Sequence, residues 1–345
     1  MALLQFETED VTKANRARAI KTAIIVLPLI AFILSIFIGR YELGFVEVVR
    51  MIFSPAQHSG EIAYSIVYDL RIPRAILGLL VGGILAASGA SLQGMFKNPL
   101  VDSGMLGVSS GAGFGAIVGI IAFGNSQAIT ILFAFGFGLI AVLLAYMIGT
   151  VYKSSPKLML VLGGVIVSAL FSSLISMGKF VADPTDQLPS IVFWLMGSLA
   201  NVSYAQVLYV LVPVLVSAIG LSILGWKINV LSMGERDAHA LGINTRVIKI
   251  LVVALSALGT AAAVSVVGTI GWIGLVIPHI VRMLLGSNNR VIIPYSFLLG
   301  AGFLALIDIL ARTITSAELP IGMLTSFIGL PFYVFLLRRT KGGGW

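Results

Sequence analysis

The sequence predicts an all-α polytopic membrane protein with about ten transmembrane helices. Of its 345 residues, 58% are hydrophobic and only 10% are charged, a composition unlike that of a soluble domain. Apolar runs of about 20 residues recur from end to end, and a helix needs this length to cross the hydrocarbon core. Backbone groups in lipid must be satisfied internally, and the alternation typical of a β-barrel is missing, so the spans are expected to be helices.

Ten apolar spans follow from these runs, and together they form one transmembrane domain that occupies the whole chain, residues 1–345. The connecting segments are too short and too apolar for a second, soluble domain. Stretches broken by Gly and Pro, such as 96–104, can hold further short helices. The expected spans are 20–38, 73–95, 104–123, 127–149, 158–178, 204–226, 246–267, 271–286, 291–311 and 320–338.

The distribution of basic residues indicates how the spans are oriented. An even number of spans puts both termini, including the segment 1–19, on one side of the membrane. The segments on that side carry 16 of the 22 Lys and Arg residues, and the opposite side carries six. Because cytoplasmic loops are enriched in Lys and Arg, both termini are expected to lie on the cytoplasmic face of the inner membrane. The same bias accounts for the net charge of +8 without a nucleic-acid partner.

Several kinds of chemistry are excluded by what the sequence lacks. Without cysteine the chain has neither disulfides nor thiolate metal sites. The three histidines, His58, His239 and His279, lie in separate segments and suggest no metal site, and His279 next to Pro278 is better explained as a structural residue. No GxxxxGK[ST] phosphate loop occurs, so we expect no ATPase site, no catalytic residue and no cofactor on this chain.

Charged side chains inside the spans are scarce, which bears on how transport is driven. Asp308 is the only acidic residue well inside a span, and Arg312 lies one helical turn later. Carriers driven by protons or sodium use ionisable groups or broken helices near the membrane midplane. The scarcity argues against an ion-coupled secondary transporter, which remains an alternative class together with a scaffold that transports nothing.

A short polar segment, 234–242, stands between two long apolar spans. Charged residues alternate there with small ones, which suits a helix that has one wet face and one packed face. The segment belongs to the connection 227–245, on the side expected to be cytoplasmic. It offers a surface on which a separate soluble protein could push, and a plain amphipathic connector is the alternative.

Taken in order, the motifs resemble those of the permease subunits of ABC importers for iron–siderophore complexes, haem and cobalamin, the type II importers. In the first half the matching residues are Arg71-Ile72-Pro73-Arg74, Gly82-Gly83, Ser88-Gly89, Gln93, Asn98-Pro99-Leu100 and 106–113. In the second half they are 234–242, 274–282 and Glu318-Leu319-Pro320-Ile321-Gly322. The resemblance covers residues 20–338, and it departs at Trp272, where these permeases more often have Phe.

The resemblance implies partners and a substrate class. It implies a homodimer of ten-helix, cobalamin-permease-like subunits, two cytoplasmic ATP-binding subunits and an extracytoplasmic substrate-binding protein. ATP hydrolysed by the partners would drive a metal chelate across the lipid bilayer. The cargo would be a ferric siderophore, haem or cobalamin, and a molybdate or tungstate oxyanion is the alternative within the same family.

The resemblance also implies roles for two sets of residues. One set matches outer-face arginines that pair with glutamates of the binding protein, and it consists of Arg71, Arg74 and Arg312. For Arg312 an i, i+4 pair with Asp308 is a second explanation, and both can hold. The other set matches a coupling helix held in a cleft of the ATPase, and it consists of Glu235, Arg236, Ala238, His239, Leu241 and Gly242.

Overall fold

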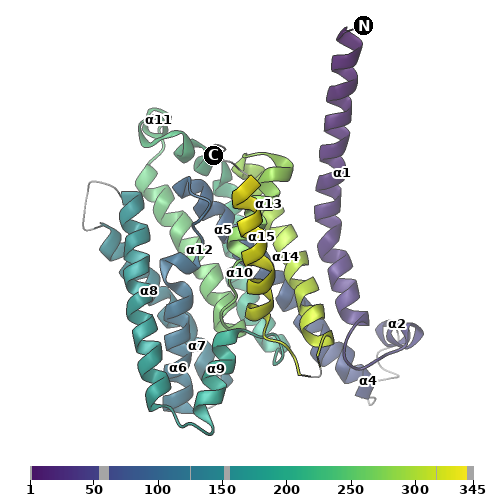
Figure 1. Cartoon of the computed structure of the whole chain (residues 1–345), viewed down its shortest axis with the longest axis vertical. Coiled ribbons are helices and arrows are strands. Elements are labelled where there is room, and N and C mark those ends of the chain that lie inside the picture. Colours follow the sequence, from purple (N-terminus) through teal and green to yellow (C-terminus); the bar gives the residue numbers. More distant parts are fainter. Residues whose placement is uncertain (1, 54–61, 125, 151–155, 316, 340–345) are drawn as a thin grey trace.

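The computed structural model describes residues 2–53, 62–124, 126–150, 156–315 and 317–339 (Figure 1). Every regular element within these ranges is a helix, which confirms the predicted all-α class. His58 lies outside the described residues, as do Lys153 and Lys341, two of the basic residues counted on the side of the termini.

The helices follow one another along the chain with short connections. In order they are α1 (Ala2–Phe37), α2 (Phe45–Phe53), α4 (Ile62–Ser65), the π-helix η1 (Ile66–Arg71), α5 (Ile72–Phe96), the 3₁₀ helix η2 (Gly104–Leu106), α6 (Val108–Phe123), α7 (Gln127–Thr150), α8 (Pro156–Val181), α9 (Gln187–Met196), α10 (Tyr204–Met233), α11 (Glu235–Ala240), α12 (Thr245–Val267), α13 (Ile273–Leu285), α14 (Asn289–Thr313) and α15 (Ile321–Arg339).

Each of the ten expected spans coincides with one of these helices. In the described part of the chain, seven helices are long and apolar enough to cross a membrane. The other three spans coincide with the shorter apolar helices α6, α13 and α15. The 13 residues of α13 correspond to about 20 Å, less than the roughly 30 Å of a hydrocarbon core. The multi-pass architecture is therefore as expected, whereas the number of ten crossings stays a prediction.

Short helical elements occupy the two connecting segments, 39–72 and 179–203, to which the apolar runs assigned no span. The first segment contains α2, α4 and η1, and the second contains α9. Val48 and Met51 are the buried residues of α2, and they pack with Ile36 of α1 and Val67 of η1. These elements are found at the end of the molecule opposite α11 (Figure 1).

Helix α5 forms the centre of the bundle and packs against α10, α12, α13 and α14. Nearly all its residues from Pro73 to Met95 are buried, and small residues line its crossings. Where α5 crosses α14, a Cβ atom added to Gly300 would lie only 2.5 Å from the Cβ of Ala86, and one added to Gly82 would overlap the backbone of Gly300. The two backbones touch here, since close packing replaces the hydrophobic drive between helices in lipid.

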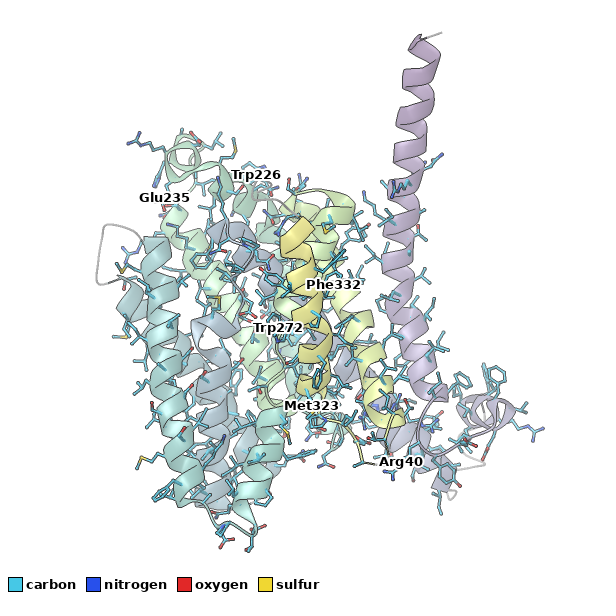
Figure 2. The ribbon with its side chains drawn as sticks, viewed as in Figure 1. Arg40, Trp226, Glu235, Trp272, Met323 and Phe332 are labelled. Atoms are coloured by element: carbon cyan, nitrogen blue, oxygen red, sulfur yellow. The ribbon has the colours of Figure 1, made fainter. Side chains whose placement is uncertain are left out.

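The bundle has two distinct ends. We call the end that carries α11 the α11 end and the opposite one the far end; Glu235 and Arg40 mark them in Figure 2. Helix α1 packs along α14, and its N-terminal half extends past the rest of the bundle on the side of the α11 end (Figure 1).

Candidate functional site

The polar segment forms its own short helix, α11, outside the main bundle (Figures 1 and 2). Gly234 precedes it with a φ of 142° and Gly242 follows it with a φ of 74°, a region of backbone space that favours glycine. These two turns set α11 apart from α10 and α12. Ala238, which is fully buried, and Ile243, which is 8% exposed, anchor it to the bundle.

The other residues of the segment face outward. Glu235, Arg236, His239, Leu241 and Gly242 are all exposed. The carboxylate of Glu235 pairs with the ammonium group of Lys249 on α12, and Nε2 of His239 lies 3.4 Å from the hydroxyl of Thr245. The expected helix with one wet face and one packed face is present, and its role in coupling stays a prediction.

The three arginines of the other set lie at the far end, and all three are buried. Arg71, Arg74 and Arg312 are 3%, 7% and 4% exposed. The topology argument predicted the side of the membrane for these residues, and it said nothing about their depth. A charge removed from water needs partners inside the protein, and each guanidinium group has them.

Arg71 holds the C-terminal end of α1. Its Nη1 donates hydrogen bonds to the carbonyl oxygens of Ile36, at 2.7 Å, and Phe37, at 3.1 Å, and its Nη2 donates to that of Tyr41 at 2.5 Å. The last carbonyl groups of a helix have no partner within the helix. A cation at this position satisfies them and also complements the helix dipole.

Arg74 joins three segments through two carboxylates. Its Nε and Nη2 donate to Asp308 of α14, at 3.0 and 2.8 Å, and its Nη1 donates to Glu318, in the loop before α15, at 2.9 Å. Asp308 is only 1% exposed. Such charge-assisted, forked pairs are among the stronger hydrogen bonds in proteins.

Arg312 completes the cluster from α14. Its Nη2 donates to the carbonyl and the hydroxyl oxygens of Ser35 on α1, both at 2.7 Å. Its Nε lies 3.8 Å from Oδ2 of Asp308, so the i, i+4 pair anticipated from the sequence is present. The three arginines thus fasten α1, α5, α14 and the loop before α15 to one another, and docking of a binding protein by them stays a prediction.

Gln93 connects several of the sequence motifs near the α11 end of α5. Its amide nitrogen donates to the carbonyl oxygens of Pro99, at 3.0 Å, and Gly274, at 3.2 Å, and its amide oxygen accepts a bond from Arg282 at 3.1 Å. These four residues all belong to the motifs that resemble those of the permease family, but no role was predicted for them. A polar amide in an otherwise apolar span was the available signal, because a buried amide needs partners.

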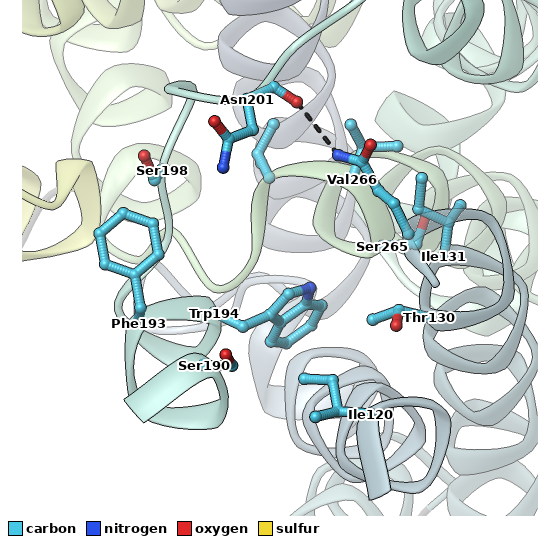
Figure 3. A pocket seen from close by; sticks show the side chains of 12 residues that line it. Ile120, Thr130, Ile131, Ser190, Phe193, Trp194, Ser198, Asn201, Ser265 and Val266 are labelled. Atoms are coloured by element: carbon cyan, nitrogen blue, oxygen red, sulfur yellow. Dashed lines mark hydrogen bonds between the residues drawn. The ribbon is translucent and has the colours of Figure 1, made fainter. Parts of the chain in front are cut away.

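Two cavities lie side by side in the half of the bundle toward the far end. The larger, of about 380 Å³, is bounded by α6, α7, α9 and α12 (Figure 3). It is lined by Ile120, Gln127, Thr130, Ile131, Ser190, Phe193, Trp194, Ser198, Asn201, Ser265, Val266 and Val267. Gln127 bridges its rim by donating to the carbonyl oxygen of Asn201 at 3.1 Å. The ring of Trp194 projects from α9 toward Thr130 (Figure 3).

The second cavity, of about 360 Å³, lies between α7, α10 and α12 and has mainly apolar walls. It shares Ile131, Ser265 and Val266 with the first. None of the described residues lining either cavity carries a charge, so both suit a neutral or amphipathic occupant.

Trp272, where the sequence departs from the motif, begins α13 in the left-handed region, with a φ of 72°. Its ring lies against α15, with its centroid 6.3 Å from that of Tyr333. Figure 2 shows it beside this helix. The larger ring of Trp272 thus lies at the contact between α13 and α15.

The two histidines within the described residues lie on different helices. His239 is on α11 and His279 is buried in α13. Within the described ranges, no group of three or more His, Cys, Asp or Glu side chains could hold a metal ion. The structural role expected for His279 stays a prediction.

A bundle of apolar helices with a separate polar helix at one end defines a multi-pass membrane permease. The chain belongs to the FecCD transport family, which it matches over residues 26–339. It is a permease subunit of an ATP-binding-cassette importer, as the motifs predicted.

Individual relatives agree with this assignment. The chain is 38% identical over 321 residues to the molybdate import system permease protein MolB of Haemophilus influenzae, covering 92% of this chain and 95% of that protein. It is 43% identical over 277 residues to a Helicobacter pylori permease named for iron chelatin transport, covering 80% and 83%. A solved structure titled as an inward-facing metal-chelate type ABC transporter aligns with a TM-score of 0.84 at 38% identity, covering 93% and 99%.

Proposed function

We propose that this permease imports a metal chelate as a homodimer, using ATP hydrolysed by two partner subunits bound at the α11 end. The observation that carries the proposal is α11 itself. Its packed face is fixed to the bundle by Ala238, while its charged face is left to water. A helix that is only an interior connector has no need of such a face, whereas a soluble ATPase can bind it.

Orientation follows from the same assignment. A cytoplasmic ATPase at α11 places the α11 end in the cytoplasm, with both termini, as the basic residues predict. The far end then faces the extracytoplasmic space and receives the substrate-binding protein.

The buried arginine cluster is proposed to act in docking by shaping this far end. Nε, Nη1 and Nη2 of Arg74 are all occupied by Asp308 and Glu318, so a direct pair with a partner carboxylate requires an exchange of partners. Glu318, whose side chain is 30% exposed, is the member of the network that a docked protein can reach.

Two substrate classes compete, and the cavities favour the chelate. A small oxyanion such as molybdate is best held by cations and convergent hydrogen-bond donors, and the described cavity walls carry no cation. A bulky chelate released into the path meets apolar and hydroxyl-bearing walls of the kind seen here. The similarity to MolB keeps molybdate as the second candidate.

The test is to purify the cognate substrate-binding protein and titrate it with a ferric siderophore, haem, cobalamin and molybdate. Tight binding of one chelate, followed by its ATP-dependent uptake into proteoliposomes that hold the permease and its ATPase, is the expected result. Binding and uptake of molybdate alone would replace the chelate by the oxyanion. Uptake by the permease without the ATPase would contradict the proposal as a whole.

A further inference from the structure

Three segments that are distant in sequence meet at the far end in one backbone junction. They are the end of α9 and the two residues after it (195–198), the end of α12 and the three residues after it (267–270), and the start of α15 (320–322). We call this contact the far-end junction. It lies beside the larger cavity, which Ser198 and Val267 line from two of the joined segments.

Direct hydrogen bonds hold the junction together. The N–H of Ser198 donates to the carbonyl oxygen of Val267 at 2.8 Å, and the N–H of Ile321 donates to that of Gly197 at 2.9 Å. The hydroxyl of Thr269 donates to the carbonyl oxygen of Leu195. Each bond joins two different segments, so the end of α12 is tied to α9, and the end of α9 is tied to α15.

The segments also leave no space between their backbones. Gly197 and Gly268 adopt φ values of 73° and 74°. A Cβ atom on Gly197 would lie 2.5 Å from the carbonyl oxygen of Thr269, one on Gly322 would lie 2.7 Å from the same oxygen, and one on Gly268 would overlap the carbonyl oxygen of Trp194. A displacement of the end of α12 therefore has to displace the end of α9 with it, because packed backbones cannot absorb it.

Helix α12 connects this junction to α11. Its 23 residues form a rod of about 35 Å with no proline inside, whereas α10, the other helix joined to α11, contains Pro213. At the α11 end the rod is fixed to α11 by the Glu235–Lys249 ion pair. The contact between His239 and Thr245 adds a second attachment.

We propose that α12 transmits movement of α11 to the far-end junction, and that Thr269 is a positioning residue of the transport cycle. When the ATPases move α11, the rod shifts the ends of α9 and α15 through the junction. The cavity beside α9 gives that helix room to move. This inference rests on the proposed function, since it requires partners that drive α11.

The experiment uses the complete complex of permease and ATPase in proteoliposomes, and the absence of native cysteines from this chain makes single reporters possible. Phe193→Cys places a thiol on the cavity face of α9, and Val46→Cys places a control thiol on the exposed face of α2, at the same end of the bundle. The rate of maleimide labelling of this chain is measured without nucleotide and with ATP plus vanadate. Each reporter is combined with Thr269, with Thr269→Val and with Thr269→Ser.

ATP is expected to change the labelling rate at position 193 in the parent. Thr269→Val, which keeps the volume and removes the donor, should reduce that change about fivefold, the effect of one lost hydrogen bond. Thr269→Ser should restore it, and the control thiol at position 46 should not respond in any variant. The ratio of uptake to ATP hydrolysed should fall with Thr269→Val and recover with Thr269→Ser.

The two levels of failure can be told apart. Loss of ATP-dependent uptake in the parent would contradict the proposed function and this inference with it. ATP-dependent uptake with an ATP-independent labelling rate at position 193 would overturn the inference alone. An equal ATP response in the parent and in Thr269→Val would overturn the inference alone. If Thr269→Val does not assemble, Thr269→Ala removes the same donor with less bulk. If Thr269→Ser does not recover the ATP-dependent change in labelling, Thr269 contributes to folding only.

Discussion

The two ends of the bundle use charged residues in opposite ways. At the α11 end, Glu235 and Arg236 face water from a helix that touches the bundle through few side chains. At the far end, Arg74 and Asp308 are buried and joined to each other. The comparison teaches that charge in a membrane protein marks either a surface for a partner or a fastening between helices, and that burial decides between them.

The energetic consequences of the two arrangements differ. An exposed ion pair contributes between about 0 and 1 kcal/mol, because water screens it. Breaking a buried pair costs about 3–5 kcal/mol, because one charge is left without compensation. Substitutions at the far end should therefore act on folding, and substitutions at the α11 end should act on partner binding.

The largest effect is expected for Asp308→Ala. This change leaves Arg74 and Arg312 buried without their shared carboxylate, and the cost should be about 3–5 kcal/mol. Thermal unfolding of the purified permease in detergent measures it. The matched control is Asp69→Ala, which removes an exposed carboxylate at the same end and should change stability by less than about 0.5 kcal/mol. Equal losses of stability in Asp308→Ala and Asp69→Ala would contradict the conclusion that burial decides what a charged residue contributes.

A smaller effect is expected for Arg71→Met. The three carbonyl groups at the end of α1 lose their donor, at a net cost of about 2–3 kcal/mol. Hydrogen exchange should rise at residues 36–41, where the bonds are made, and stay unchanged in α12. The control is Arg40→Met, because Arg40 is exposed. If this variant raises hydrogen exchange at residues 36–41 as much as Arg71→Met does, the carbonyl contacts of Arg71 do not hold the end of α1.

Leu241→Ser tests the α11 end. The side chain is 56% exposed, so the fold should be indifferent to the change. Affinity for the ATP-binding subunit should fall about tenfold, or roughly 1.4 kcal/mol, as for a moderate interface contact. Titration of the detergent-solubilised permease with the ATPase measures it, and Leu241→Met should retain binding. Unchanged affinity for Leu241→Ser would remove this residue from the proposed interface.

The smallest effect on stability is expected for Glu235→Gln. Its pair with Lys249 is partly exposed, so the loss should be about 0.5 kcal/mol or less and should vanish at high salt. The same variant should lower uptake per ATP hydrolysed, because α11 is then less firmly attached to α12. The double variant Glu235→Lys with Lys249→Glu restores the ion pair with the charges exchanged. If its uptake per ATP hydrolysed is as low as that of Glu235→Gln, the ATPase contacts the carboxylate of Glu235 directly.

Much of the architecture could be predicted from local patterns. The ten helices follow from long apolar runs, and α11 follows from a polar segment between two of them. The pair of Asp308 and Arg312 follows from helical spacing. The helices α2 and α9 were missed because each is too short for an apolar span, at 9 and 10 residues.

The partners of the far-end arginines could not be predicted. Arg74 meets carboxylates that lie 234 and 244 residues later in the chain, and no local pattern encodes such a contact. Arg71 binds backbone carbonyl groups, which every residue has, so its partners leave no trace in the sequence. Charge distribution predicts the side of the membrane on which these residues lie, but it carries no information about how deeply their side chains are buried.

The separation of Arg74 from its carboxylates also governs the biosynthesis of the chain. At about 5–20 residues per second, the ribosome needs on the order of 10–50 s to reach Asp308 after it has made Arg74. During this interval the guanidinium group of Arg74 has neither carboxylate, so it needs water or another partner. The contacts that bury Arg74 can therefore form only after α14 and the loop before α15 have been made.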